Sequence, residues 1–266
     1  MGEAAVAILI LLAAAAYALG THRLALRRAG RRGPALHDGW WFSAGLAVLA
    51  ASLFGPLDEW SERSFALHMS QHEIIMLAAA PLLVRGRPLA RWAWALGRRG
   101  RARLRASLSA WQSLGIWRAC TSVTGACVLQ ALALWAWHMP LWFRAALAHP
   151  GVHILQHATF LVVALCFWWS VLRPGPPRTV AVRGIATLFF TTLTTGALGA
   201  LLTFASTPWY LGADAEPPFG LTVLEDQQVG GLIMWIPGGA VYLAFAVWLG
   251  ARALSSVAAP PACEAR

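Results

Sequence analysis

The sequence predicts an all-helical membrane protein, a seven-transmembrane-helix bundle with its N-terminus outside and its C-terminus in the cytoplasm. Apolar residues make up 58% of the 266-residue chain and charged residues 12%, whereas soluble domains average about 45–50% and about 25%. The mean hydropathy is +0.58, and the chain contains 15 Trp. These values exclude a soluble enzyme of this size, and they exclude a disordered chain, which requires low hydrophobicity.

Seven stretches of the chain are apolar and long enough to cross the roughly 30 Å hydrocarbon core of a bilayer. The first is expected to be a span, because a cleaved signal carries its positive charges before its apolar region, and here Glu3 precedes it and Arg23 follows it. We expect one membrane domain over 1–256 and a short cytoplasmic tail over 257–266. The predicted spans cover residues 3–20, 39–56, 66–84, 119–138, 152–172, 185–207 and 228–250.

The distribution of arginine predicts the orientation of these spans. All 21 basic side chains are Arg, and the segments after spans one, three, five and seven carry 5, 9, 3 and 2 of them. The segments after spans two, four and six carry one, one and none. Cytoplasmic loops of membrane proteins carry an excess of positive charge, so the Arg-rich segments are expected in the cytoplasm. The formal net charge of +10 therefore reflects topology, and no nucleic-acid partner is expected.

The Arg-rich loop 85–118 is the one sizeable segment between the predicted spans. Its residues 88–96 are mostly apolar and include two Trp, and an Arg-rich run follows over 98–105. This pattern suits a helix lying on the anionic inner leaflet, and it is equally typical of a solvated basic loop. Anionic lipids at the Arg-rich cytoplasmic loops are accordingly one expected partner.

Histidine is the residue that this topology gathers at one face of the membrane. Two of the eight His, His22 and His37, fall in the first cytoplasmic loop and are expected to be solvated. A single His within a span is commonly a buried polar group bonded to a neighbouring helix, but ionisable groups gathered at one depth are costly and usually functional. The six His expected near the outer face are His68, His72, His138, His149, His153 and His157.

Two pairs of these histidines have a spacing that suits metal binding. They lie within the frames His-Met-Ser-Gln-His and His-Ile-Leu-Gln-His, so the two rings of each i,i+4 pair share a helix face. Two imidazoles placed in this way can chelate one metal ion. The spacing and the topology predict a metal site at His68, His72, His138, His153 and His157, and the additional candidates are Met69, Met76, Met139, Glu73 and Asp226.

Copper is the metal that these side chains favour, because imidazole and thioether ligands suit copper, and Cu(I) in particular, better than hard cations. Asp226 opens span seven at the same face. There it could bind the metal, orient a ligating His or act only as an interfacial acid near a helix N-terminus. Adjacent residues of a helix point about 100° apart, so Glu73 need not face the metal together with His72.

Two other functions remain open at this point. A haem-binding membrane redox protein needs axial ligands from both faces of the haem, which one i,i+4 His pair cannot supply. The crowding of the His at one face also argues against haem, and haem is not expected. A proton- or ion-coupled transporter would use the same His and acidic residues as an ion path.

The cysteines and threonines carry no chemistry in this interpretation. Cys120 and Cys127 lie in the inner half of span four and Cys166 in the inner half of span five, where apolar packing is expected and disulfides are not. Span six is rich in Thr and contains Gly196 and Gly199, which is typical of close helix packing. The sequence contains no Walker loop and no nucleophile elbow, and no enzymatic activity is expected.

An ordered set of motifs over residues 40–250 resembles one known family, the multi-span bacterial CtaG family of cytochrome c oxidase assembly factors. Glu73 and the segment Arg85-Gly-Arg87 depart from the family pattern, since apolar or neutral residues are expected there. The motifs that carry the resemblance are His68-Met-Ser-Gln-His72, Ala80-Pro81-Leu82-Leu83, Trp137-His138-Met139-Pro140, Val152-His153-Ile-Leu-Gln-His157, Leu198-Gly199-Ala200 and Asp226-Gln227-Gln228-Val-Gly230-Gly231.

The resemblance implies a multi-pass protein of the bacterial inner membrane that assists the maturation of a haem-copper cytochrome c oxidase. It implies a metallochaperone of the respiratory chain that delivers copper to an oxidase subunit, and oxidase subunits are therefore expected partners. Carried over by position, the residues implicated are His68, His72, His138, His153, His157 and Asp226.

Overall fold

The computed structural model describes residues 2–27, 35–113, 115–210, 212 and 216–258. Within these ranges 87% of the residues are helical and none lies in a strand, so the predicted all-helical fold is confirmed. In chain order the elements are α1 (Gly2–Arg27), α2 (Ala35–Leu53), α3 (Pro56–Ser61), α4 (Phe65–Glu73), the π-helix η1 (Ile74–Ala79), α5 (Ala80–Arg85), α6 (Pro88–Ala95), α7 (Arg98–Ser113), α8 (Ile116–Cys120), α9 (Val123–Trp137), α10 (Pro140–Ala148), α11 (Pro150–Leu172), α12 (Pro177–Thr203), the 3₁₀ helix η2 (Pro218–Gly220) and α13 (Val223–Ala258).

Five helical segments among the described residues are long and apolar enough to cross a membrane. A sixth candidate is α9 together with α10, which are bent by 71° at a short break. The bend follows from Pro140, which starts α10 and cannot continue the hydrogen bonding of α9. The remaining predicted span, 39–56, falls on α2, and the count of seven stays a prediction. The five unbroken segments are Ala4–Arg27, Phe65–Arg85, Pro150–Leu172, Pro177–Thr203 and Val223–Ser255.

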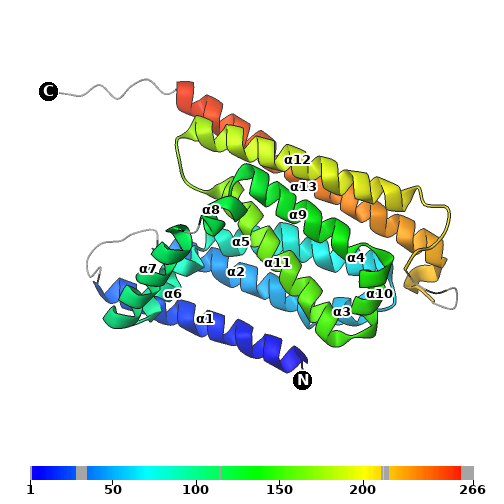
Figure 1. Ribbon diagram of the computed structural model, residues 1–266, viewed down its shortest axis with the longest axis horizontal. Helices are drawn as coiled ribbons and strands as arrows, with labels where there is room; N and C mark the ends of the chain where they lie inside the picture. The colour runs from blue at the N-terminus through cyan, green and yellow to red at the C-terminus, as the bar shows by residue number, and fades with distance from the viewer. Residues whose placement is uncertain (1, 28–34, 114, 211, 213–215, 259–266) are drawn as a thin grey trace.

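The two ends of the bundle differ in their side chains. Helices α6 and α7 and the last turns of α13 lie towards one end (Figure 1), which we call the arginine end because α7 carries five Arg. Helices α3 and α10 lie at the opposite end (Figure 1), which we call the histidine end. Which end faces the cytoplasm stays a prediction of the positive-inside rule.

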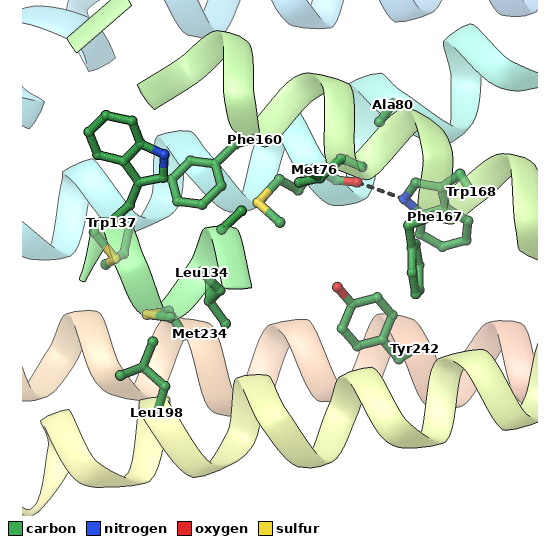
Figure 2. Close-up of a cluster of buried hydrophobic side chains, with 14 of the residues drawn as sticks. Met76, Ala80, Leu134, Trp137, Phe160, Phe167, Trp168, Leu198, Met234 and Tyr242 are labelled. Atoms are coloured by element: carbon green, nitrogen blue, oxygen red, sulfur yellow. Dashed lines mark hydrogen bonds between the residues drawn. The ribbon is translucent and has the colours of Figure 1, made fainter. Parts of the chain in front are cut away.

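The third predicted span is interrupted by a π-helix. The backbone N–H of Ala80 bonds to the carbonyl of Ile75, five residues back, so the π partner of the Met76 carbonyl would be Pro81. Proline has no N–H, and the indole Nε1–H of Trp168 instead donates to the Met76 carbonyl at 2.7 Å. This bond, drawn in Figure 2, satisfies a backbone acceptor that would otherwise be unpaired in hydrocarbon.

The largest hydrophobic cluster surrounds this bond and joins η1, α9, α11, α12 and α13. Phe167 and Trp168 on α11 are fully buried, and Tyr242 packs against both of their rings. Figure 2 shows Leu134 and Met234 from facing helices in the same cluster.

The α12–α13 pair shows the close packing predicted for span six, and the two helices run side by side along one flank (Figure 1). A Cβ atom at Gly199 would lie 2.8 Å from the carbonyl oxygen of Gly231, and one at Gly231 would lie 2.6 Å from that of Gly199. Only glycine at these two positions lets the backbones approach so closely. Several threonine hydroxyls of α12 bond within the helix, as Thr192 does to the carbonyl of Leu188 at 2.8 Å.

Replacing Gly231 with Ala is expected to destabilise this pair. The new Cβ would also lie 2.6 Å from Thr203 Oγ1, and overpacking of this kind costs about 1–3 kcal/mol. Gly239→Ala on the same helix is the control, because a Cβ there meets nothing within 4 Å. We expect the midpoint of thermal unfolding in detergent to fall for Gly231→Ala alone. Equal midpoints for the two variants would contradict the close packing.

Candidate metal centre

Four histidine rings from two helices meet at the histidine end of the bundle. The ring centroids of the i,i+4 pairs are 4.4 Å apart for His68 and His72 on α4, and 4.3 Å apart for His153 and His157 on α11. Across the two helices the centroids of His68–His153, His72–His157 and His68–His157 are 5.3, 5.2 and 6.2 Å apart. The structure thus brings together four of the predicted ligands, which we call the four-histidine cluster.

Most of the ring nitrogens in this cluster have no hydrogen-bond partner. Both nitrogens of His68 and His72 and the Nε2 atoms of His153 and His157 are buried and unpaired within the described part of the chain. His68 is 0% exposed and His157 is 9% exposed. An unsatisfied buried polar group costs about 1–3 kcal/mol. The six nitrogens are therefore candidate ligand atoms, and the His68 ring also lies beside the Ser61 backbone and the Gln156 side chain.

His138 and Met69 form a second pair of donors close to the cluster. His138 caps the C-terminus of α9, and its Nδ1 lies 2.7 Å from the carbonyl oxygen of Leu134. Because a carbonyl only accepts, Nδ1 carries the proton, which leaves a lone pair on Nε2 of the neutral ring. That Nε2 lies 3.1 Å from the sulfur of Met69. An imidazole nitrogen and a thioether sulfur thus face each other in a buried place.

Asp226 does not lie among the histidine rings. Its Oδ2 accepts the backbone N–H of Phe65 at 2.6 Å, and its Oδ1 accepts the Ser64 hydroxyl at 2.6 Å and the backbone N–H of Ala66 at 3.3 Å. Ser64 is itself the N-cap of α4 and accepts the backbone N–H of Leu67. None of the three roles considered for Asp226 describes these contacts, which cap and orient α4, the helix that carries His68 and His72.

The two glutamines after Asp226 bond to the segment that follows α12. Gln227 Oε1 accepts the backbone N–H of Trp209 at 2.7 Å, and Gln228 Nε2 donates to the carbonyl of Ala205 at 3.0 Å. The neighbouring Tyr210 donates its hydroxyl to the carbonyl of His138 at 2.8 Å. Burial raises the pKa of the Tyr210 hydroxyl, which keeps it protonated as a donor. The Asp-Gln-Gln motif is thus a set of positioning residues.

Two of the additional candidates, Met139 and Glu73, lie away from the four-histidine cluster. Met139 is 53% exposed. Met76 is buried in the hydrophobic cluster of Figure 2, which also contains Met69. Glu73 is turned towards α13, where its Oε2 lies within 2.9 Å of the place that a Cβ of Gly238 would take. The angle of about 100° between adjacent helical residues accounts for the separation of Glu73 from the His72 ring. His22 and His149 are exposed, and the side chain of His37 lies outside the described residues.

Sequence reasoning missed three polar side chains beside the cluster. Gln71 Nε2 donates to Asp58 Oδ1 at 2.7 Å and to the carbonyl of Ser52 at 2.8 Å, which ties α4 to α3. Asp58 and Glu62 lie close enough to His153 for electrostatic interaction. Two features of the sequence could have indicated these residues. A Gln precedes the second His of both His frames, and Asp58 and Glu62 are spaced four residues apart.

The cysteines take no part in the cluster. Cys120, Cys127 and Cys166 are free thiols, and Cys127 lies against α12, with its sulfur 3.6 Å from the carbonyl oxygen of Thr187. Within the described ranges, no group of three or more His, Cys, Asp or Glu side chains is arranged to hold a metal ion as the side chains stand. A metal bound to the four-histidine cluster would therefore require the rings to turn towards a common point.

Comparison with known families decides the identity. Residues 15–256 match the family model described as cytochrome c oxidase caa3 assembly factor. The chain belongs to this family. The match includes every element of the site described above, and neither a curated protein nor a solved structure matches the chain.

Membership in the caa3 assembly factor family confirms the resemblance predicted from the His and Asp-Gln-Gln motifs. The apolar helices and the family together identify a multi-pass bacterial membrane protein. The family concerns assembly of cytochrome c oxidase, so oxidase partners follow from membership.

Replacing Asp226 with Ala is expected to destabilise the protein, because the N-terminus of α4 loses three hydrogen bonds to a charged acceptor. Bonds to charged groups contribute about 1.5–3 kcal/mol each. Asp226→Asn keeps one carbonyl oxygen and should lose less. Glu59→Ala, at an exposed position of α3, is the control. The measurement is the midpoint of thermal unfolding in detergent. Midpoints of all three variants equal to that of the unmodified protein would rule out the capping role.

Proposed function

We propose that the protein binds copper at the four-histidine cluster, on the periplasmic side of the membrane, and delivers it to a subunit of the oxidase that its family assembles. Copper is the cargo in this role and leaves the protein unchanged. The observation that carries the proposal is the set of six buried imidazole nitrogens without partners. Neutral imidazole is the commonest metal ligand in proteins, and two pairs on facing helices supply a complete set of nitrogen donors.

The choice of copper rests on the sulfur next to the cluster. Met69 is buried beside the Nε2 of His138, and soft thioether ligands select Cu(I) among the common biological metals. Hard cations such as Mg²⁺ and Ca²⁺ prefer oxygen ligands and gain little from a thioether. The pair of Met69 and His138 therefore supports a copper site that continues from the four-histidine cluster.

Release of the copper ion follows from the same arrangement. The ligands come from α4, from α11 and from His138 at the C-terminus of α9. Because they lie on separate elements, they can be exchanged one at a time for ligands of an oxidase subunit. His153 is less buried than His68 and His72 and is the first ligand that an acceptor would reach. Exchange of ligands leaves the oxidation state of copper unchanged, and no enzymatic step is needed.

We also propose that α7 rests on an anionic membrane surface. The guanidinium of Arg101 stacks over the Trp94 ring at 4.1 Å, which joins α7 to the amphipathic α6. Each basic residue near such a surface contributes about 1 kcal/mol. The basic residues of α7 are Arg98, Arg99, Arg101, Arg103 and Arg105.

Removing one histidine pair is expected to abolish copper binding. The protein, purified in detergent and loaded with Cu(I), should hold about one or two copper ions per chain by elemental analysis. The His68→Ala/His72→Ala double variant should hold none. The control is His22→Ala/His149→Ala, which removes two exposed imidazoles and should bind copper like the unmodified protein.

Three results would overturn the proposal. One is an unmodified protein that binds no copper after loading, and another is a double variant that binds as much as the control. The third is a Soret band in the visible spectrum of the purified protein, which would identify a haem protein.

In cells lacking the natural gene, the His68→Ala/His72→Ala variant should also fail to restore cytochrome c oxidase activity in membranes.

Met69→Leu is expected to weaken Cu(I) binding while it keeps the apolar volume of the side chain. Loss of a group beside a metal site typically costs 10- to 100-fold in affinity, and we expect a decrease of that size for Cu(I). Binding of Cu(II) to imidazole should change little. Competition with a Cu(I) chelator measures the effect, and Met139→Leu is the exposed control. Equal Cu(I) affinities for the two variants would exclude the thioether as a ligand.

A further inference from the structure

A long apolar groove runs along α11 beside the four-histidine cluster. Its volume is about 980 Å³, and its walls are the N-terminal half of α1, one side of α2 and one face of α11. Most of the side chains that line it are aliphatic or aromatic. His153 and His157 form part of the wall, so the groove adjoins the cluster on the side where α11 faces α1.

The helix α1, which lines the groove with its N-terminal half, is fastened over its C-terminal half. Trp92 Nε1 donates to the carbonyl of Ala13 at 3.0 Å, the Tyr17 hydroxyl donates to the carbonyl of Gly86 at 2.8 Å, and Arg23 bonds to the carbonyl of Ala95. These bonds hold α1 against α6 at the arginine end and leave its N-terminal half as a wall of the groove.

The groove follows α11 for most of the length of that helix. From His153 to Trp169 the lined face of α11 is about 24 Å long at 1.5 Å per residue. Because the walls along this length are mostly aliphatic and aromatic, extended hydrocarbon chains suit the groove.

The two ends of the groove differ in polarity. At the histidine end its lining includes the carboxyl groups of Asp58 and Glu62, and at the other end it includes the indoles of Trp117 and Trp169. His157 adds an unpaired, nine-tenths buried Nε2 to the wall near the acidic end. Two carboxylates attract a cationic group and repel an anionic one, so the acidic end suits an ammonium head group.

We propose that this groove binds a zwitterionic amphiphile, an ethanolamine phospholipid, with its hydrocarbon chains along α11 and its ammonium group at Asp58 and Glu62. The length of about 24 Å exceeds half of the roughly 30 Å hydrocarbon core, so the bound chains lie extended past the middle of the bilayer. They cover the side of His153 and His157 that faces α1. The inference concerns lipid binding alone and does not depend on the metal.

The test compares lipid retention after reconstitution. The full chain is placed in vesicles with equal amounts of an ethanolamine phospholipid and a glycerol phospholipid of the same acyl chains, re-extracted in detergent and analysed by native mass spectrometry. We expect a retained ethanolamine phospholipid that is lost in Ala158→Trp, because exposed Ala158 lines the groove and an indole fills it. Ala136→Trp, at an exposed position of α9, should retain it.

A charge reversal tests the head group separately. In Glu62→Lys the lipid retained in the groove should change from the ethanolamine to the glycerol phospholipid. Lipid bound at α7 can be told apart from lipid in the groove, because Ala158→Trp should displace only the lipid in the groove. Thermal unfolding reports whether each variant is folded, and Val162→Trp, also exposed in the groove, replaces Ala158→Trp if that variant is not. Equal retention in the groove-filling variants and in Ala136→Trp, or equal retention of the two lipids in the unmodified groove, would overturn the proposal.

Discussion

The candidate site depends on one carboxylate bonded to the start of one helix. Asp226 reaches from α13 to the backbone N–H groups of Phe65 and Ala66 and to the hydroxyl of Ser64. In a membrane these groups have no water to bond, and the positive end of the α4 dipole favours a negative charge beside it. The contact fixes both the position and the rotation of α4. The direction in which His68 and His72 point follows from that rotation.

Much of this arrangement could be predicted from local patterns. The i,i+4 spacing placed each His pair on one helix face, and the arginine count placed both pairs at one end of the bundle. The four rings do meet, with centroids 4.3–6.2 Å apart. These predictions succeeded because helix periodicity and the cost of burying charge act over short stretches of sequence. Copper itself is not among the properties that such patterns determine, and it rests on the proposal above.

The remaining features depend on contacts between distant residues. The roles of Gln71, Asp58 and Asp226 each require a partner on another helix, and a sequence pattern does not specify that partner. The π-helix is a similar case, because it is stabilised by the Trp168 indole, 92 residues from the Met76 carbonyl that it meets. The bend after α9 had a local signal in Pro140, and the predicted span 119–138 ended just before it, but the sequence did not show that α10 would follow at an angle of 71°.

The wide separation of the site residues along the chain has a consequence for the timing of synthesis. His68 and His72 emerge from the ribosome well before His153 and His157, and Asp226 comes later still. Chains fold in order from the N-terminus during synthesis, so the first pair waits without its partner helix until α11 is inserted, and without its cap until α13 follows. Under the proposed function, a growing chain holds only half of the nitrogen donors before α11 is made, and α4 is oriented by its cap only when the whole bundle is in the membrane.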